Sequence, residues 1–316
     1  MHDLSVLIPF LNEADNIERL TTELSRFFAT KNNLKVEVIF IDDGSRDASI
    51  ALLQQASHQH YTPKIIKLSR NFGSHAALRA GIWHATGKYI AFMYADLQDP
   101  LTLLDEMLTQ AQAGKEIVWA VRKTTQNSFS EKLFSQTYAY LMRRYAVPNF
   151  PEKGFDIVMF GQKVQAQLNQ NIESNSSVFL QILTMGFPQT TIEYDKQARK
   201  IGKSKWTFRK KIKIFVDSFV AFSFAPIRFV TIVGFLLFIL GGFYGAYIVC
   251  RKLIYNDLEQ GWASLIAILM LGFGVTNISL GIIAEYLWRT LDASRKRPVF
   301  IVEDVFLPFG DANNEK

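Results

Sequence analysis

The sequence predicts an α/β domain with a largely parallel sheet, followed by two helices that cross a membrane. Short apolar runs rich in Ile, Val and aromatic residues alternate with longer stretches of helical spacing in the first 121 residues. Two long uncharged runs lie near the C-terminal end. The 316 residues provide for one domain of roughly 200 residues and a smaller appendage.

Five apolar runs are short enough to be buried strands and carry no helical periodicity. They are residues 4–10, 36–41, 64–69, 89–95 and 116–121. Helical spacing fills the intervals at residues 16–30, 48–58, 74–85 and 101–113. In parallel sheets of this kind ligands bind at the carboxyl ends of the strands, so the residues after each run are the candidate site.

Polar clusters follow four of these strands. They are Pro9-Phe10-Leu11-Asn12-Glu13, Asp42-Asp43-Gly44-Ser45, Arg70-Asn71-Phe72-Gly73 and Asp96-Leu97-Gln98-Asp99. Taken singly, Ser45, Asp47 and Pro100 are explained by turns and helix caps. Asp42 and Asp96 are not, because a carboxylate that directly ends an apolar run costs free energy unless it has a partner or a ligand.

The two uncharged runs predict a transmembrane hairpin. Residues 229–250 form a run of 22 and residues 261–284 a run of 24. At about 1.5 Å per residue each can cross a hydrocarbon layer of about 30 Å. Buried core helices are the alternative, although two such runs separated by about ten residues would be unusual in a soluble domain. We expect helices at 227–250 and 261–288, joined by a short non-cytoplasmic loop at 251–260.

The cations orient this hairpin. The segment Lys196–Lys213 contains nine Lys or Arg and no acid, and further cations follow the second run. Because cytoplasmic loops carry the excess of Lys and Arg, we expect a multi-pass protein of the inner membrane with its N-terminal domain in the cytoplasm. The net charge of +6 is concentrated beside the membrane runs, which favours anionic headgroups over nucleic acid as its partner.

The N-terminus and the cysteine content agree with a cytoplasmic domain. Met1-His2-Asp3 leads directly into the first strand, without the basic start and apolar stretch of a signal peptide. A lone Cys250 excludes an intramolecular disulfide and a cysteine metal cluster.

Six motifs together resemble family 2 glycosyltransferases, and within them the polyprenyl-phosphate branch that contains dolichol-phosphate mannose synthase and bacterial undecaprenyl-phosphate glucosyltransferases. They are IPFLNE (8–13), DDGSRD (42–47), LSRNFG (68–73), ADLQDP (95–100), RKIGKSKW (199–206) and EYLWR (285–289) with KRP (296–298). The resemblance implies a GT-A-type nucleotide-sugar domain over 1–205 and a cytoplasmic tail over 289–316. Between the domain and the hairpin, 206–226 mixes cations with Phe, Ile and Val and predicts an interfacial amphipathic helix.

The resemblance assigns residues to the donor sugar nucleotide. It implies that the nucleotide is held by Pro9, Glu13, Asp42, Asp43 and Arg70. Asp96 and Gln98 would hold a Mg²⁺ or Mn²⁺ that bridges the donor phosphates. The chain departs from the usual Asp-Ala-Asp pattern, because Tyr94 stands where the first carboxylate is expected. Asp99 is a weaker substitute ligand.

The acceptor side follows from the same resemblance. Arg122, Lys132, Ser135, Arg199 and Lys205 are candidates for binding a lipid phosphate. For each cation alone, a solvated surface residue is the alternative. Asp156 would lie near the reaction centre, as would Asp96, and would position the sugar or acceptor or act as a base. A plain strand-end carboxylate is the alternative for Asp156.

The implied reaction is inverting transfer of a sugar from a nucleotide-diphosphate sugar, with uridine expected, to polyprenyl (undecaprenyl) phosphate. The product would be a lipid-linked sugar for cell-envelope glycans. Two alternatives remain. A processive polysaccharide synthase would carry Gln-x-x-Arg-Trp, whereas Trp288-Arg289 has the opposite order. A catalytically impaired membrane scaffold of the same fold is suggested by Tyr94. Glycine-rich stretches at 241–245 and 272–274 would permit a homo-oligomer.

Overall fold

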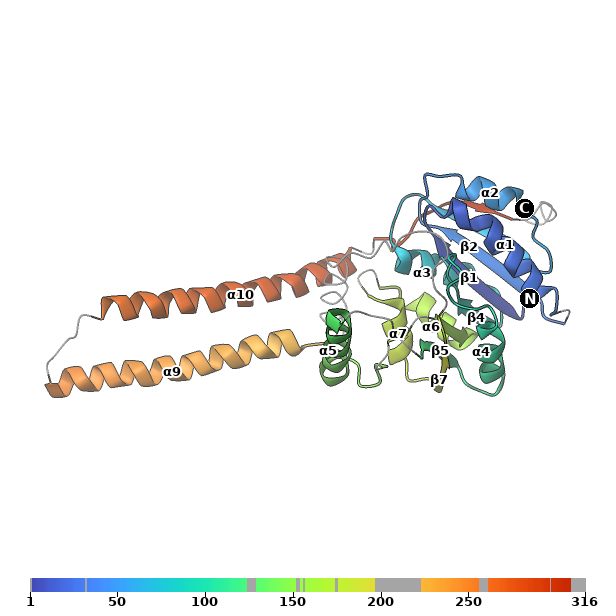
Figure 1. The fold of residues 1–316 in the computed structure, drawn as a ribbon. Coiled ribbons are helices and arrows are strands. Elements are labelled where there is room, and N and C mark those ends of the chain that lie inside the picture. The colour runs from blue at the N-terminus through green and yellow to red at the C-terminus, as the bar shows by residue number, and fades with distance from the viewer. Residues whose placement is uncertain are drawn as a thin grey trace.

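The protein consists of an α/β domain from which two long helices project side by side (Figure 1). The computed structural model describes residues 2–31, 33–123, 129–151, 154–155, 157–173, 176–196, 223–255, 261–295 and 297–307. The predicted interfacial helix at 206–226 therefore lies almost entirely outside the described residues.

One sheet of eight strands organises the domain, in the order β7-β5-β6-β4-β1-β2-β3-β8. The strands are β1 (Leu4–Phe10), β2 (Val36–Asp42), β3 (Thr62–Leu68), β4 (Tyr89–Phe92), β5 (Ile117–Arg122), β6 (Ile157–Gly161), β7 (Gln189–Tyr194) and β8 (Val302–Phe306). β1 pairs in parallel with β2 and β4, β2 with β3, and β5 with β7. β6 runs antiparallel to β4 and β5, and β8 runs antiparallel to β3. The predicted mostly parallel α/β architecture is confirmed.

Helices cover both faces of this sheet (Figure 1). The helices of the domain are α1 (Ala14–Phe28), α2 (Ser49–Gln55), α3 (Ser74–His84), α4 (Leu103–Gln112), α5 (Phe129–Tyr145), α6 (Gln162–Gln170) and α7 (Val178–Thr184). Side chains alternate along each strand, so β1 sends Val6 and Ile8 toward one core, which contains Leu20 of α1, and Leu7 toward a second, which contains Ala77 of α3. Burial on both faces explains why the central strands are continuous apolar runs.

The two projecting helices are α9 (Ala225–Tyr255) and α10 (Trp262–Ser294). Each contains a window apolar enough to cross a membrane, Ala225–Tyr247 with mean hydropathy 2.1 and Ile268–Ser294 with mean hydropathy 1.7, and neither window is buried in the protein. Phe238 and Phe243 expose 77% and 75% of their surface. Exposure of large apolar side chains along a whole helix is typical of a membrane surface rather than of a soluble core.

The segment 289–316, predicted as a cytoplasmic tail, contains regular structure in its described part. α10 continues to Ser294, and residues 302–306 then form β8 at the edge of the sheet. Ser69 N donates to Ile301 O at 3.0 Å, and Lys67 Nζ lies 2.8 Å from Glu303 Oε1. Without β8, β3 would be an edge strand with unpaired backbone groups. The segment after α10 therefore returns to the N-terminal domain and completes its sheet.

Glu37 lies near the start of β2, at the end of the sheet opposite the carboxyl ends of the parallel strands, and binds residues of several neighbouring segments. Its side chain is 1% exposed and accepts hydrogen bonds from Ser5 Oγ at 2.5 Å and from Thr86 N at 2.6 Å, with Lys64 Nζ at 3.5 Å. Burial raises the pKa of Glu37, but the hydrogen bonds from Ser5 and Thr86 and the charge of Lys64 outweigh it, so the pKa lies below 4.5.

We expect Glu37→Ala to lower the free energy of unfolding by about 3 kcal/mol, because it leaves Lys64 and the Ser5 and Thr86 donors without their acceptor. The pKa of Glu37 is lower in the folded state, so its stabilisation is complete above about pH 4.5 and is lost as the pH falls through the folded pKa. Denaturant unfolding of the detergent-solubilised chain at several pH values measures both effects. Glu303→Ala, which breaks an exposed pair, should cost less than about 1 kcal/mol. Equal costs for the two variants would contradict the role of Glu37.

Candidate active site

The loops that follow β1 and β2 are joined by hydrogen bonds. Asn12 adopts a positive φ of 52°, its backbone N donates to Ser45 Oγ at 2.8 Å, and its side-chain oxygen accepts from Arg46 N at 2.8 Å. Glu13 N donates to Ser49 Oγ at 3.0 Å. These bonds give Asn12, Ser45 and Ser49 a structural role, and they join the loop after β1 to the loop after β2.

Asp42 and Asp43 are both buried at the end of β2. Asp42 accepts from Ser45 N at 3.0 Å, and Asp43 Oδ1 accepts from Phe72 N at 2.7 Å. Burial raises the pKa of both carboxyls, against the lowering effect of these hydrogen bonds, and the charge of Asp42 raises the pKa of Asp43 further. Two adjacent buried acids repel an anion. They favour hydrogen-bond donors, such as the hydroxyl groups of a ribose or the N–H groups of a base.

The loop after β3 packs directly against Gly44. A Cβ at this position would come within 2.6 Å of Arg70 C and Asn71 N, and Gly44 has a φ of +77°. Arg70 is exposed, and its guanidinium carbon lies 4.0 Å from the centre of the Phe72 ring. The structure therefore brings Pro9, Glu13, Asp42, Asp43 and Arg70 to neighbouring ends of β1, β2 and β3.

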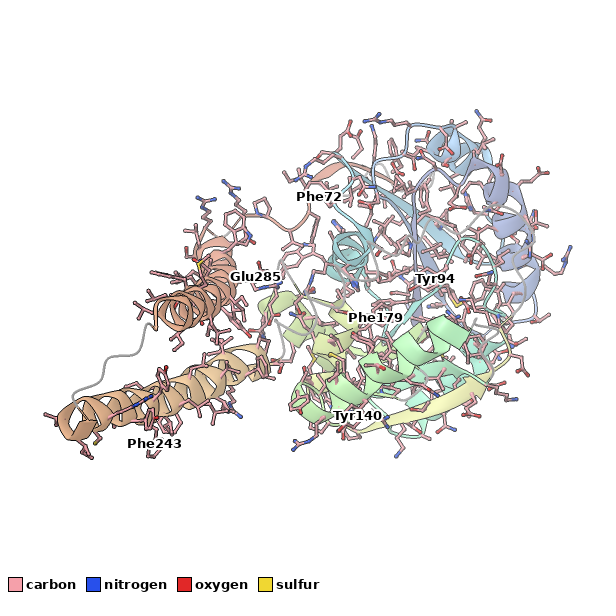
Figure 2. All side chains as sticks on the ribbon, turned by 60° about the vertical axis from the view of Figure 1, so that its left-hand side comes forward. Phe72, Tyr94, Tyr140, Phe179, Phe243 and Glu285 are labelled. Carbon is pink, nitrogen blue, oxygen red and sulfur yellow. The ribbon has the colours of Figure 1, made fainter. Side chains whose placement is uncertain are left out.

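The loop after β4 carries Asp96 and Gln98, both partly buried. Gln98 N donates to Asp96 Oδ1 at 3.3 Å, and Leu97 between them has a positive φ of 50°. Tyr94, labelled in Figure 2, packs against the core that includes α1. The chain thus turns sharply after Ala95. Asp96 and Gln98, which both carry side-chain oxygens, lie on this one turn.

Asp99 has structural partners that the sequence did not reveal. It is 1% exposed, accepts a hydrogen bond from the Tyr194 hydroxyl, and lies 3.1 Å from Lys196 Nζ. The same ammonium lies 6.0 Å from the centre of the Tyr94 ring. Nothing in a linear pattern links Asp99 with residues almost a hundred positions later. Because its carboxylate is neutralised by Lys196, Asp99 does not fit the role of substitute metal ligand.

The donor set fits a hard cation only in part. Among the described residues no three His, Cys, Asp or Glu side chains are grouped as a metal site. Asp96 and Gln98 remain as one carboxylate and one amide oxygen. Mg²⁺ and similar ions commonly keep water and phosphate ligands, so two protein oxygens are compatible with a site that donor phosphates complete.

The matching family model, Glycosyl transferase family 2, covers residues 5–171. This range contains β2 to β6, all of β1 except Leu4, and all of the predicted donor-side residues. The chain belongs to glycosyltransferase family 2. Its fold is accordingly the GT-A type, with a mostly parallel sheet.

Curated relatives match this glycosyltransferase over its whole length. The uncharacterized glycosyltransferase sll0501 of Synechocystis is 32% identical over 96% of both chains. The prophage bactoprenol glucosyl transferase homolog of Escherichia coli is 29% identical over 96% of this chain and 99% of its own. The undecaprenyl-phosphate 4-deoxy-4-formamido-L-arabinose transferase of Klebsiella pneumoniae is 28% identical over 96% and 93%. The similarity therefore includes the two apolar helices.

The acceptor candidates of the glycosyltransferase are only partly described. Arg122 ends β5 and is partly buried, and Ser135 is exposed on α5. Lys132 lies on α5, but its side chain is outside the described residues, as are Asp156, Arg199 and Lys205. The roles of these residues stay predictions.

An aromatic cluster surrounds Phe155. Phe155 stacks on Phe179 with ring centres 5.3 Å apart and an interplanar angle of 17°, and Phe155 also lies 5.0 Å from Trp119. His75 and Phe179 form an edge-to-face pair with ring centres 5.9 Å apart; Phe179 is labelled in Figure 2. Burial lowers the pKa of His75 to about 4, with the charge of Arg79 acting in the same direction, so the imidazole is neutral near pH 7.

We expect Asp99→Asn and Lys196→Met each to lower sugar transfer by about 10- to 100-fold, because both release the loop of Asp96 from the end of β7. Since the two residues act as a pair, the double variant should be no worse than either single variant. Initial rates at several Mn²⁺ concentrations measure the effect. Asp195→Asn, in an exposed pair with Lys123, is the matched control. A higher Mn²⁺ requirement in Asp99→Asn alone would instead make Asp99 a metal ligand.

Proposed function

We propose that this glycosyltransferase transfers a sugar from a nucleotide-diphosphate sugar, with uridine as the expected base, to undecaprenyl phosphate. One observation supports the proposal most strongly. The buried acids Asp42 and Asp43 lie at the strand ends of a domain that continues into two exposed apolar helices. The printed names of the bactoprenol and undecaprenyl-phosphate relatives support the acceptor. They name different sugars, so the sugar is left to the experiment.

Asp43, Asp42 and Glu13 would bind the base and ribose, which offer N–H and O–H donors. These acids lie where the loops after β1 and β2 are fixed by hydrogen bonds, so little ordering is required when the nucleotide arrives. Arg70 is exposed beside them and would approach the nucleotide from solvent. Pro9 contributes a rigid backbone at the end of β1.

Asp96 and Gln98 would hold a Mg²⁺ or Mn²⁺. When bound, such an ion neutralises charge that builds on the departing diphosphate. Asp96 supplies the anionic ligand, Gln98 an amide oxygen, and the pair of Asp99 and Lys196 keeps their loop in place.

The acceptor phosphate would attack the anomeric carbon from the face opposite the departing diphosphate, which inverts the configuration. A phosphate monoester with a second pKa near 6 is largely ionised at cytoplasmic pH, so it needs little general-base help. Asp156 would then position the sugar or acceptor. Arg122, Lys132, Ser135, Arg199 and Lys205 would bind the phosphate oxygens.

The proposed setting is the cytoplasmic face of the inner membrane. α9 and α10 would span the bilayer, with 251–260 on the far side, and the basic segment after Lys196 would remain in the cytoplasm. The product would be a lipid-linked sugar for assembly or modification of cell-envelope glycans. Association of two copies through the glycine-rich stretches of α9 and α10 stays a prediction.

Incubation of the purified chain with radiolabelled nucleotide sugars, undecaprenyl phosphate and Mn²⁺, followed by solvent extraction, tests the proposal. We expect label from one donor to enter the lipid phase, and no label to enter when the acceptor is omitted. Polymeric product would favour a processive synthase. Nucleotide-sugar binding without turnover for every donor would favour the impaired scaffold that Tyr94 suggests.

A further inference from the structure

The loop that follows β3, residues 69–73, has one side against the buried acids at the end of β2. Phe72 N donates to Asp43 Oδ1 at 2.7 Å, and Gly73 N donates to Asp43 Oδ2 at 3.0 Å. Asp43 is 5% exposed, so the direction of its carboxylate depends on these two amides. The position of the loop therefore sets the position of an acid that we propose binds the nucleotide.

The other side of the same loop is in contact with the segment that returns from α10. In the sheet, β3 lies between β2 and β8, and β8 pairs with β3 as far as Val302 and Leu68. The pairing then continues beyond the end of β3, because Ser69 N donates to Ile301 O at 3.0 Å. A hydrogen bond from the C-terminal segment thus holds the first residue of the loop.

Phe300 adds side-chain packing to this backbone contact. Phe300 and Phe72 are both partly buried, and both pack against the core that contains Leu68 of β3 and Ala77 of α3. In Figure 1 the segment after α10 passes α3 before it joins the sheet, and in Figure 2 Phe72 is labelled beside it. The loop is therefore held at its start by the C-terminal segment and at its end by Asp43.

The two attachments of the loop differ in what they require of the nucleotide site. The attachment at Asp43 is made by the site itself, whereas the attachment at Ile301 and Phe300 comes from residues about 230 positions later in the chain. A loop without the second attachment would regain backbone freedom. That freedom would have to be lost again whenever a nucleotide bound, which weakens binding.

We propose that the C-terminal residues 299–302 position the nucleotide site, with Phe300 acting through the loop 69–73 on Asp43. Phe300 is thus a positioning residue. The inference rests on the proposed role of Asp43 in nucleotide binding. It makes binding of the sugar nucleotide depend on a segment that only residues 295–298 separate from α10.

Phe300→Ala in the full detergent-solubilised chain tests the positioning, with Phe306→Ala as the matched control. Phe306 is also partly buried, but it lies at the other end of β8, opposite Ile65, and packs against the other core. Thermal unfolding compares the stability of the two variants. Calorimetric titration with UDP measures nucleotide affinity, and hydrogen exchange of the peptide containing residues 69–73 measures how firmly the loop is held.

We expect Phe300→Ala to lower UDP affinity by about tenfold and to speed exchange in residues 69–73, because a displaced binding group loses most of its contribution. Phe306→Ala should lower the unfolding midpoint by a similar amount but leave UDP affinity within about twofold of the wild type. Phe300→Leu, which keeps an apolar side chain, should recover most of the affinity. In steady-state transfer, KM for the sugar nucleotide should rise in Phe300→Ala more than kcat falls.

Equal UDP affinities in Phe300→Ala and the wild type, or equal losses in Phe300→Ala and Phe306→Ala, would overturn the positioning role and leave the proposed function intact. If Phe300→Ala does not unfold cooperatively, Phe300→Leu decides: faster exchange in residues 69–73 supports the role, and unchanged exchange overturns it. A wild-type chain that does not bind UDP would instead overturn the nucleotide assignment of Asp43, and the inference with it.

Discussion

Asp96→Ala is expected to lower the rate of sugar transfer by at least about a thousandfold while the protein stays folded. Asp96 is the one carboxylate that the loop after β4 offers to a metal, because Asp99 is paired with Lys196 and Tyr94 replaces the usual first acid. A metal that neutralises a departing diphosphate contributes several kcal/mol, and each 1.4 kcal/mol is about a factor of ten. Asp96 is only partly buried, so its loss should leave the unfolding midpoint unchanged.

Two companion variants make this result specific. Asp195→Asn should retain full activity, because Asp195 is 71% exposed and makes only a long surface pair at 3.7 Å. Tyr94→Asp would place a carboxylate at the position where the Asp-Ala-Asp pattern has its first acid. This variant should reduce the Mn²⁺ concentration that gives half of the maximal rate. Full activity of Asp96→Ala would refute the assignment of Asp96 to the metal.

Gly44→Ala is expected to have the second large effect, a loss of nucleotide binding together with reduced stability. The new methyl group would lie 2.6 Å from two backbone atoms of the loop after β3, which cannot rotate away as a side chain could. That loop supplies the amides of Phe72 and Gly73 that hold Asp43. Displacing it would misplace Asp43, the acid that we propose binds the nucleotide, so we expect UDP affinity to fall at least about tenfold, as for misplaced binding groups in general.

Gly114→Ala separates the two causes of this effect. Gly114 also has a positive φ, of +95°, but a Cβ there would meet nothing within 4 Å. It should therefore show only the conformational cost of about 1 to 2 kcal/mol and normal UDP affinity. Calorimetric titration with UDP and thermal unfolding measure the two quantities. Equal UDP affinities for the two variants would mean that the contact with the loop after β3 is unimportant.

The sequence alone predicted the elements whose signal is local. The first five strands and first four helices were found with ends shifted by only a few residues, because alternation, helical spacing and turn residues act over short distances. The two uncharged runs became α9 and α10 for the same reason. The donor-side clusters could also be predicted, since the carboxyl ends of parallel strands necessarily meet at one edge.

Tertiary structure decided everything that depends on partners distant in the chain. The motif ADLQDP offered Asp96 and Gln98 as metal ligands with Asp99 as a weaker substitute, and only the fold showed that Asp99 pairs with Tyr194 and Lys196. The predicted tail supplied β8 because β3 needed an edge partner. The local sequence pattern thus indicated which side chains are candidates for the site. Burial and pairing with residues distant in the chain determined which candidates, such as Asp99, have a structural partner instead.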